Sequence, residues 1–421
     1  MKVLVIGNGG REHAIIKKLK ENKNITSIYC APGNDGISND AGCLNVAATD
    51  IEGLVNLSKE YQFDFICVTP DDPLALGCVD ALEKEGFKCF GPRKNAAIIE
   101  ASKVFAKDLM AKYNIPTAKY KAFNDAKDAI EYIKTQSFPI VIKADGLALG
   151  KGVIIAQDLN EAKTAINEMM LDNKFGSAGK EIVIEEYLQG PEVSVLCFTD
   201  GKYIKPMVSS MDHKRAFDND EGLNTGGMGT IAPNPLYNND IAKITYETIL
   251  LPTIKALEKE NRIFKGCLYV SLMLTKDGPK VIEYNSRFGD PETQVVLPLL
   301  ESDLLEIMMA CENGTLENID VKFSNKSACC VIYATKGYPE HYEKGYPIIL
   351  SEEAINHCDF AGVKKIDNQY FSNGGRVLGI TSIKDNLKDA IDDAYRIISQ
   401  IDFKDGFYRH DIGKRALERK K

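Results

Sequence analysis

The chain of 421 residues has no tryptophan and no apolar stretch long enough to cross a membrane. A membrane-spanning helix needs about 20 predominantly apolar residues. Near the start, the apolar run at residues 3–6 is followed by charge at Arg11, so it is too short for a signal peptide. We therefore expect a strand and a loop at this end, no membrane association and a cytoplasmic protein.

The chain also lacks an excess of positive charge. It has 52 Lys and Arg against 60 Asp and Glu, which gives a net charge of −8 and a pI of about 5.4. This balance argues against nucleic acid or an anionic membrane as the main partner. Local basic pockets for phosphate groups remain compatible with it.

Paired cysteine spacing is absent although the chain has 11 Cys, and no C-x-x-C motif occurs. Cys67, Cys89, Cys267 and Cys330 lie in apolar, strand-like runs, where cysteine behaves as a small buried hydrophobe. A reducing, cytoplasmic setting fits this pattern. The five His show no metal-ligand spacing.

A recognisable nucleophile is missing too. No Ser or Cys lies in a nucleophile elbow, and no pair of carboxylates has an interpretable spacing. The chemistry must then depend on positioning and on electrostatic stabilisation of phosphoryl transfer.

The length predicts two to four domains, at roughly 150 residues per domain. Residues 1–100 alternate between short apolar strands and helical segments, which predicts a doubly wound parallel sheet. The expected elements here are strands at 2–6, 25–30, 63–68 and 88–90 and a helix at 12–21.

Further along, the pattern predicts a mixture of helices and strands around one long loop. Helices are expected at 95–113, 125–135, 160–170, 240–260, 300–312 and 386–400. Strands are expected at 139–143, 152–156, 181–186, 267–275, 279–286, 328–335 and 375–381. Residues 201–240 are rich in Gly, Asn and Asp and are expected to form a long functional loop. A polar tail ends the chain.

The strand expected at 279–286 carries the most informative pattern. Side chains alternate along a strand, so Glu283, Asn285 and Arg287 should point to one face. Carboxylate and amide oxygens suit a hard cation such as Mg²⁺, and a guanidinium suits a carboxylate or a phosphate. The row predicts a metal–nucleotide site with an anion clamp; a solvated face of an edge strand is the alternative.

Gly7-Asn8-Gly9-Gly10 lies between the first strand and the first helix, where backbone amides can hold a phosphate. Glu12 stands where the dinucleotide fingerprint needs a third glycine. The acid expected after the second strand is also missing. A nicotinamide or flavin is therefore disfavoured, which leaves a substrate phosphate or a turn without a ligand.

A second glycine-rich segment runs from Lys143 to Gly152 and contains Gly146, Gly150 and Lys151. Flexible backbone combined with cations allows a loop to fold over phosphates. The segment does not match the P-loop pattern, and a plain glycine-rich hairpin is the alternative.

Two further segments combine charge with turn residues. Glu185 and Glu186 end an apolar strand, with Glu192 beyond them, and could bind a base and a ribose; the alternative is a solvated strand end. His213-Lys214-Arg215 precedes Asn224-Thr225-Gly226-Gly227 and suits an anionic substrate; the alternative is ordinary surface charge.

Taken in order, these segments resemble one family, phosphoribosylamine–glycine ligase, also called glycinamide ribonucleotide synthetase, of the ATP-grasp superfamily. The resemblance extends from residue 7 to residue 413. The matching stretches include G-N-G-G-R-E-H, K-A-D-G-L-A-x-G-K-G-V, E-E-Y-L-x-G-x-E, H-K-R-x-x-D-x-D-x-G-x-N-T-G-G-M-G, E-Y-N-x-R-F-G-D-P-E-T-Q, N-G-G-R-V-L and F-Y-R-x-D-I-G. One departure is Thr69-Pro70-Asp71-Asp72-Pro73-Leu74, where the family usually has G-P-E-x-P-L.

The resemblance implies a reaction that joins glycine to 5-phosphoribosylamine, with ATP and Mg²⁺ or Mn²⁺. The products are glycinamide ribonucleotide, ADP and phosphate, a step of de novo purine synthesis. The glycine carboxylate would attack the γ-phosphate to give glycyl phosphate, which the amine then attacks. Because water would hydrolyse an acyl phosphate, the glycine-rich region should close as a lid.

The resemblance also implies roles for individual residues. The metal ligands are Glu283 and Asn285. The ATP-binding residues are Lys103, Lys143, Gly150, Lys151, Gly152, Glu185, Glu186, Leu188 and Glu192. The substrate-binding residues are Gly9, Gly10, His213, Lys214, Arg215, Asn224, Thr225, Gly226, Gly227, Arg287, Gly289 and Asp290. Arg287, Asp290 and Lys143 are expected to be catalytic, with Arg287 and Asp290 holding glycine and the Gly9-Gly10 loop holding the ribose phosphate.

The fold implied is a multidomain α/β and α+β protein. Residues 1–102 would form an N-terminal α/β substrate-binding domain with a doubly wound parallel sheet. Residues 103–325 would form the ATP-grasp region with a mobile lid at about 120–195, and residues 326–421 a small mixed α/β C-terminal domain. We expect a monomer that binds small molecules only, without nucleic acid or membrane.

Two alternatives remain open. The first is another ATP-grasp carboxylate–amine ligase, or a transformylase acting on a related ribonucleotide; the H-K-R…N-T-G-G-M-G segment argues against it. The second is a non-catalytic nucleotide-binding regulator, which should have lost Glu283, Asn285 or Lys143, whereas all three are present.

Overall fold

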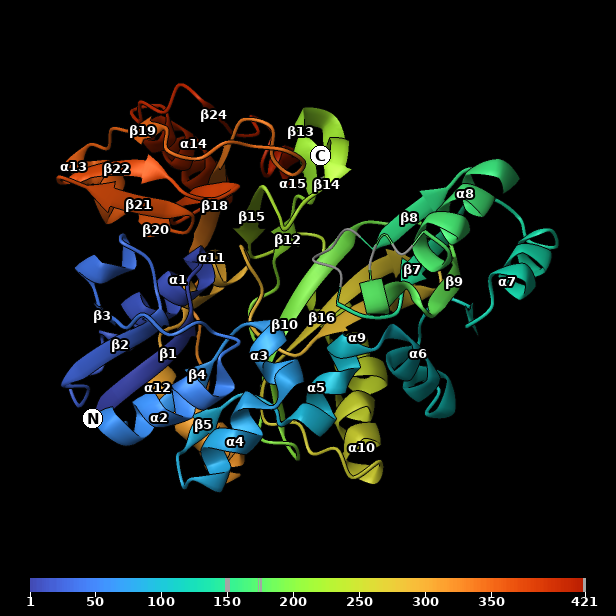
Figure 1. Ribbon diagram of the computed structural model, residues 1–421, viewed down its shortest axis with the longest axis horizontal. Helices are drawn as coiled ribbons and strands as arrows, with labels where there is room; N and C mark the ends of the chain where they lie inside the picture. The colour runs from blue at the N-terminus through green and yellow to red at the C-terminus, as the bar shows by residue number, and fades with distance from the viewer. Residues whose placement is uncertain (148–151, 173, 175, 419–421) are drawn as a thin grey trace.

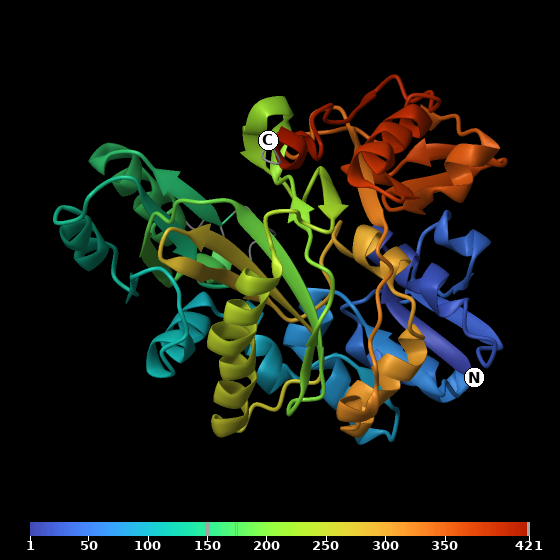
Figure 2. The same ribbon diagram turned by 180° about the vertical axis from the view of Figure 1, so that it is seen from behind.

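The computed structural model describes residues 1–147, 152–172, 174 and 176–418 (Figure 1). None of the helices in these residues is both long and apolar enough to cross a membrane. The N-terminal and C-terminal regions lie together on one side of the molecule, and the region that carries α7 and α8 projects on the other side (Figures 1 and 2).

The N-terminal region contains the predicted parallel sheet, with strand order β3-β2-β1-β4-β5. Its strands are β1 (Lys2–Gly7), β2 (Ser27–Pro32), β3 (Gly42–Cys43), β4 (Phe65–Val68) and β5 (Cys89–Phe90). Its helices are α1 (Gly10–Leu19), α2 (Ile51–Tyr61), α3 (Asp71–Leu76) and α4 (Cys78–Lys84). Val3, Leu4, Val5 and Ile6 of β1 are fully buried, as expected for the middle strand of a sheet covered on both faces.

The predicted helix at 95–113 is two helices, α5 (Lys94–Ala101) and α6 (Lys103–Lys112). The break is at Ser102, which has extended backbone and whose side chain accepts a hydrogen bond from the Phe105 amide. Serine favours such an N-terminal cap. Both helices pack against the central sheet, and the break places Lys103 at the start of the second one.

The projecting region is a four-stranded antiparallel sheet with order β6-β9-β7-β8. Its elements are β6 (Tyr120–Phe123), α7 (Ala126–Ile133), β7 (Ile140–Ala144), β8 (Val153–Ala156), α8 (Leu159–Met170) and β9 (Ile182–Glu186). The two helices pack with the sheet around a separate hydrophobic core that includes Ile142, Ile166 and Ile184. This region therefore has a core of its own beside the rest of the chain.

The central sheet is antiparallel, with order β11-β10-β16-β17. Its strands are β10 (Glu192–Thr199), β11 (Ile204–Pro206), β16 (Gly266–Thr275) and β17 (Gly278–Asn285), and α9 (Asn239–Thr245) and α10 (Leu251–Lys259) belong to the same part of the chain. A bulge interrupts the pairing of the last two strands, because Ser271 pairs with Glu283 and Leu272 pairs with Val281. Ile282 is the extra residue, and such bulges redirect side chains.

Residues 201–240 differ from the predicted loop, since they contain a series of short strands. These are β11, β12 (Met211–Asp212), β13 (Arg215–Phe217), β14 (Glu221–Asn224) and β15 (Gly229–Ala232). Strands of two to four residues are too short to show an alternating pattern. The Gly and Asn content therefore led to the prediction of a loop. Strand β11 belongs to the central sheet, and β12 and β15 join the C-terminal sheet.

The C-terminal sheet has the order β12-β15-β18-β23-β20, with β24 beside β18, and a small sheet β19-β22-β21 lies next to it. The strands are β18 (Ser327–Thr335), β19 (Pro347–Ile348), β20 (Cys358–Phe360), β21 (Val363–Ile366), β22 (Gln369–Ser372), β23 (Arg376–Lys384) and β24 (Gly406–Phe407). The helices from here and from the preceding connection are α11 (Thr293–Val296), α12 (Leu304–Asn313), α13 (Glu352–Asn356), α14 (Leu387–Ile398) and α15 (Lys414–Glu418). The expected polar tail thus contains a short helix.

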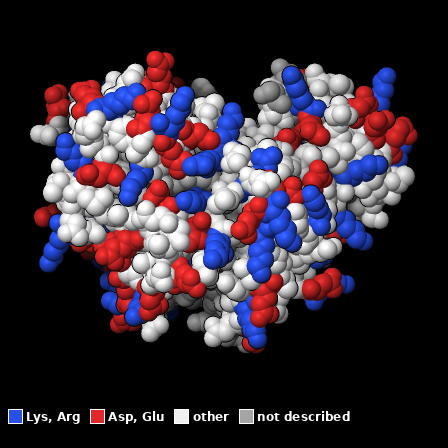
Figure 3. All heavy atoms as spheres, turned by 90° about the horizontal axis from the view of Figure 1, so that it is seen from below, with Lys and Arg blue, Asp and Glu red and all other residues white. Residues whose placement is uncertain are grey.

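Basic and acidic side chains are interspersed over the face shown in Figure 3. This distribution fits the small negative net charge and the expectation that phosphate binding depends on local pockets.

Candidate active site

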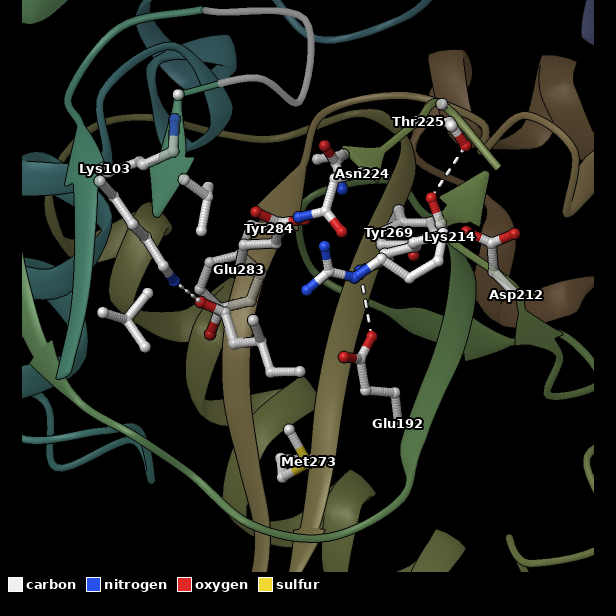
Figure 4. Close-up of a pocket in the computed structure, with 18 of the residues that line it drawn as sticks. Lys103, Glu192, Asp212, Lys214, Asn224, Thr225, Tyr269, Met273, Glu283 and Tyr284 are labelled. Carbon is white, nitrogen blue, oxygen red and sulfur yellow. Dashed lines mark hydrogen bonds and ion pairs between the residues drawn. The ribbon is translucent and has the colours of Figure 1, made fainter. Parts of the chain in front are cut away.

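A cavity of about 1000 Å³ lies where the N-terminal, central, projecting and C-terminal regions meet. Arg11 and Asp71 reach it from the N-terminal region, and Tyr338, Arg376 and Arg415 reach it from the C-terminal region. In the close-up of Figure 4, Lys103 and Glu283 lie towards one end and Asp212 and Lys214 towards the other. We call these the ATP end and the substrate end, after the ligands predicted for Lys103 and for Lys214.

Glu283, Asn285 and Arg287 all line this cavity, as the alternation along the strand predicted. Strand β17 is an edge strand, as the alternative of a solvated face assumed. The bulge at Ile282 allows Val281 and Tyr284 to pack into the core while Glu283 turns to the cavity. An edge strand therefore presents a polar row to an enclosed site.

Glu283 lies in a field of positive charge. Burial alone would raise the pKa of its carboxyl group, but the charges of Lys214, Lys143 and Lys103 outweigh this effect, and the pKa lies below its usual value. The carboxylate is therefore ionised at neutral pH and available to a cation.

Arg287 is held by a residue that the sequence patterns did not reveal. Its Nη2 lies 3.0 Å from Oε1 of Glu100, and the other carboxylate oxygen of Glu100 accepts hydrogen bonds from the amide and hydroxyl of Ser286 at 2.7 and 2.8 Å. Burial raises the pKa of Glu100 despite this arginine. Arg287 Nη1 donates to the Phe288 carbonyl, and no partner binds Nε within the described residues, so part of the fork is already engaged.

A buried chain of charges lies behind the ATP end. Glu185 is 3.0 Å from the ammonium groups of both Lys143 and Lys107, and all three side chains are almost fully buried. Burial, partly offset by Glu185, lowers the pKa of Lys107 to about 8. Lys107 was not predicted, although it lies four residues after Lys103 on α6, so the two share one helix face.

Lys103 lines the cavity and donates a hydrogen bond to the Gly146 carbonyl at 3.2 Å. Burial lowers the pKa of its ammonium group. Gly152 also lines the cavity. Gly150 and Lys151, which were predicted to bind ATP, lie outside the described residues.

The other predicted nucleotide contacts line the same cavity: Glu186, Leu188 and Glu192. Glu186 accepts a hydrogen bond from the Lys119 amide at 3.0 Å, which ties the end of β9 to the residue before β6. Glu192 is paired with Lys214 at 3.2 Å, at the boundary between the two ends.

The three adjacent basic residues are separated from one another in the structure. Lys214 and Arg215 line the cavity, but His213 does not and is fully buried. Its Nδ1 donates to the Gly229 carbonyl and its Nε2 accepts from the Gly413 amide, both at 3.1 Å. Burial lowers the pKa of this imidazole to about 4, so it is neutral and joins β12 to the C-terminal end of the chain.

The N-T-G-G turn borders the cavity through Asn224, Thr225 and Gly226. The Gly226 amide donates to the Tyr338 hydroxyl at 3.1 Å, and its carbonyl accepts from Arg376 at 2.8 Å. The C-terminal region thus holds this turn from two sides. Gly227 lies outside the cavity lining.

In the Gly9-Gly10 loop, which is predicted to hold the ribose phosphate, one backbone amide is already engaged. The Gly9 amide donates to the Glu12 carboxylate at 2.6 Å, so this amide already has an acceptor. A Cβ at Gly7 would lie 2.6 Å from the Glu12 side chain, which explains the glycine there. Arg11, rather than either predicted glycine, reaches the cavity.

Asp290 lines the cavity and is held by the C-terminal region, 3.0 Å from Arg376 Nη2. Burial would raise the pKa of Asp290, but the charges of Arg376 and Arg11 outweigh it and the pKa is lowered. Gly289 lies behind the wall, because a Cβ there would be 2.4 Å from the Glu292 carboxylate.

The residues present suit a hard divalent cation bound through a nucleotide. Glu283 and Asn285 offer oxygen atoms only, and no cluster of three His, Cys, Asp or Glu residues that could hold a metal occurs in the described chain. Mg²⁺ usually takes one or two protein ligands and completes its shell with phosphate oxygens and water. The set fits that arrangement and does not distinguish Mg²⁺ from Mn²⁺.

Two antiparallel sheets that enclose a lysine-rich cavity with such a cation site define an ATP-grasp enzyme. Family models match almost the whole chain: the phosphoribosylglycinamide synthetase N domain at residues 1–100, its ATP-grasp (A) domain at 101–293 and its C domain at 328–415. The chain belongs to the phosphoribosylglycinamide synthetase family.

Individual relatives agree with this assignment. A phosphoribosylamine–glycine ligase from Caldanaerobacter subterraneus is 48% identical over 98% of this chain and 99% of its own length. One from Clostridium acetobutylicum is 45% identical, covering 98% and 100%. The crystal structure of phosphoribosylamine–glycine ligase from Thermotoga maritima superposes with a TM-score of 0.88 at 32% identity, covering 98% of this chain and all of that one. A biotin carboxylase from Campylobacter jejuni, at 14% identity, a TM-score of 0.75 and coverage of 97% and 92%, shares the fold.

Proposed function

We propose that this chain joins glycine to 5-phosphoribosylamine with ATP and forms glycinamide ribonucleotide, ADP and phosphate. The observation that carries the proposal is the row Glu283, Asn285 and Arg287 on one wall of a cavity that the family's three domains share. The row brings a cation site next to an anion clamp, as a transfer of phosphate to a carboxylate requires.

At the ATP end, Glu283 and Asn285 would hold Mg²⁺ or Mn²⁺, which neutralises charge on the transferring phosphate when bound. Lys143 and Lys103 would bind the phosphates, together with the segment that includes Gly150, Lys151 and Gly152. The base and the ribose would lie against Glu185, Glu186, Leu188 and Glu192. The buried Lys143–Glu185 pair supports these roles, because it fixes the ammonium group at the cavity wall.

At the substrate end, Arg287 would orient the glycine carboxylate for attack on the γ-phosphate, and Asp290 would complete the glycine site. The amine of phosphoribosylamine then attacks the glycyl phosphate, and inorganic phosphate leaves. Both steps depend on positioning and on electrostatic stabilisation, and the described lining of the cavity contains no Ser, Cys or His.

The ribose phosphate would bind among the basic side chains of the substrate end. Arg11, Lys214, Arg215, Arg376 and Arg415 line this part of the cavity. Asn224, Thr225 and Gly226 would add polar contacts, and His213, Gly227 and Gly289 would act from behind the wall. For the Gly9 amide to take part, Glu12 would have to release it.

We also propose the division into residues 1–102, 103–325 and 326–421, with residues 120–195 as a lid. The separate core of the projecting sheet supports a lid that moves as a body. Closure would exclude water from the acyl phosphate. A monomer in the cytoplasm is proposed as well, and the 11 free cysteines fit a reducing compartment.

The test is ADP release from the purified chain with each substrate omitted in turn. We expect release only when glycine and phosphoribosylamine are both present. Release without phosphoribosylamine, or with bicarbonate replacing glycine, would favour a different ATP-grasp reaction and overturn the proposal.

A further inference from the structure

Asp212 and Glu292 are two acidic side chains at the substrate end that have no ion-pair partner in the described chain. Asp212 ends β12, Glu292 follows the turn after β17, and both line the cavity. Most other acids of the cavity are paired with a lysine or an arginine. These are Glu100, Glu185, Glu186, Glu192, Asp220 and Asp290.

Three more acids of the cavity also have no basic partner within the described residues, but each has a different setting. Glu283 belongs to the proposed cation site. Glu340 is exposed on the C-terminal loop, and Asp71 lies on α3 of the N-terminal region. Asp212 and Glu292 are therefore the pair to explain.

Gly227 lies between Asp212 and the turn that carries Glu292. A Cβ at this position would lie 2.8 Å from Oδ1 of Asp212 and 2.4 Å from Cδ of Pro291, the residue before Glu292. The backbone of Gly227 also has φ of +115°, which L side chains rarely adopt. The absence of a side chain lets β12 contact the turn that carries Glu292.

One oxygen of each carboxylate accepts a hydrogen bond, and the other accepts none from the part of the chain that the structure describes. Oδ1 of Asp212 accepts from the His213 amide at 2.7 Å, and Oε1 of Glu292 accepts from the Tyr269 hydroxyl at 3.0 Å. Among the residues that the structure describes, no donor binds Oδ2 of Asp212 or Oε2 of Glu292. Two anchored carboxylates with available oxygens suit the three donors of an ammonium group.

A bound cation would also stabilise the two neighbouring negative charges of this pair. Burial raises the pKa of Asp212 well above its usual value, and the charge of Glu292 raises it further. Lys214 and Arg376 lower it, but their own ion pairs are with Glu192 and Asp290. Glu292 is buried and Asp212 is half-buried, and neighbouring carboxylates in such places are costly unless a cation compensates them.

Arg287 lies close to both Glu292 and Tyr269, which help to raise the pKa of its guanidinium group. An α-amino acid carries a carboxylate and an ammonium group on one carbon, so it needs an arginine and an acid close together. We propose that Asp212 and Glu292 bind the ammonium group of the amino-acid substrate while Arg287 holds its carboxylate. This inference rests on the proposed function and adds what selects an amino acid over a simple carboxylate.

The test compares Asp212→Asn and Glu292→Gln with the unchanged chain in steady-state assays of ADP release. A hydrogen bond to a charged group is worth about 1.5–3 kcal/mol, so KM for glycine should rise roughly 10- to 100-fold in each variant. KM for ATP should change less than about twofold. Glu340→Gln, the same change at an exposed cavity residue, is the matched control and should leave both constants within about twofold.

A second measurement uses glycolate, which has a hydroxyl group in place of the ammonium group, as an inhibitor competing with glycine. Its inhibition constant should change less than about threefold in both variants, so the preference for glycine over glycolate should collapse. Equal losses for glycine and glycolate would overturn the inference. A fall in kcat with unchanged KM for glycine would also overturn it, since the pair would then act on the chemical step.

The failure of this inference can be separated from the failure of the proposed function. If the unchanged chain releases ADP without glycine, the proposed function is wrong. If the unchanged chain requires glycine and both variants keep its KM within about twofold, only the ammonium site is wrong. Circular dichroism and thermal unfolding report whether each variant folds, and one folded variant suffices to decide.

Discussion

The two ends of the cavity are built in different ways. At the ATP end, Lys143, Glu185 and Glu283 are on neighbouring strands or on the strand that faces them, and all belong to one matched domain. At the substrate end, Arg11, Asp290 and Arg376 come from three separate domains. The first end is fixed by strand register, and the second depends on how domains pack.

This difference separates two kinds of robustness. Register holds the ATP-end side chains as long as the sheets are intact, because slipping a strand by one residue would turn every side chain over. The substrate end is held by a few polar contacts between domains, such as Arg376 with Asp290 and Gly226 with Tyr338. Changes at the first end should affect ATP chemistry, and changes at the second should affect the other substrates.

The largest effect is expected at Glu283. Glu283→Gln removes the charge that holds the cation, and a bound metal ion stabilises a transition state by several kcal/mol, so kcat/KM should fall roughly a thousandfold. Steady-state assays across Mg²⁺ concentrations measure this loss, which added Mg²⁺ should only partly restore. Glu258→Gln, at an exposed position of α10, is the control and should retain activity. Activity of Glu283→Gln within about tenfold of the unchanged chain would refute the metal assignment.

Several residues that the structure brings to the ATP end of the cavity were predicted from the sequence to share a site. The alternation in β17 placed Glu283, Asn285 and Arg287 on one wall, and the parallel N-terminal sheet followed from its strand–helix rhythm. Periodicity worked on β17, which has eight residues, whereas the N-terminal sheet followed from the order of its strands and helices although two of its strands have only two residues. Periodicity could not reveal the bulge at Ile282, which depends on pairing with β16.

The substrate end was harder to predict because its residues meet only through tertiary packing. His213 has the same local pattern as Lys214, yet it is buried against Gly229, 16 residues later, and Gly413, 200 residues later in the chain. Glu100 and Asp212 carry no motif of their own. No local sequence pattern predicts which acid will contact which arginine.

The short strands at 201–240 were not predicted, for a related reason. Within the described residues, β13 and β14 pair with each other alone. Strand β15 pairs with β12 and with β18, which lies more than 90 residues away. Strand β10 was missed as well, although seven of its eight residues are buried. A fully buried strand has no alternating pattern to detect.

A smaller effect, confined to the substrate end, is expected for Arg376. Arg376→Gln leaves Asp290 buried without its ion-pair partner and removes a hold on the Gly226 carbonyl. KM for phosphoribosylamine should rise about 10- to 100-fold, with KM for ATP changed less than about threefold. Arg376→Lys keeps the charge but loses the planar guanidinium group. Its KM for phosphoribosylamine should lie between those of the unchanged chain and Arg376→Gln. An equal rise in both KM values would show that the two ends are not separable.

The smallest effect concerns the stability of the substrate end at acid pH. The folded pKa of His213 is about 4, because burial disfavours the charged ring, against 6.5 for an unperturbed histidine. Between these values the unfolded chain binds a proton that the folded chain does not, so stability falls as pH falls from 6.5 towards 4 and is unaffected by this group above 6.5. This group should therefore cost the unchanged chain about 2 kcal/mol between pH 7.5 and pH 4.5.

His213→Gln removes this titration and isolates it from other acid-sensitive groups. The variant should be less stable than the unchanged chain at pH 7.5, and the difference should shrink by about 2 kcal/mol at pH 4.5. Urea unfolding followed by circular dichroism at the two pH values measures the difference. His341→Gln, at an exposed position, should show little change at either pH. A difference that stays constant with pH would mean that folding does not lower the pKa of His213, and that domain packing at the substrate end does not depend on a neutral ring.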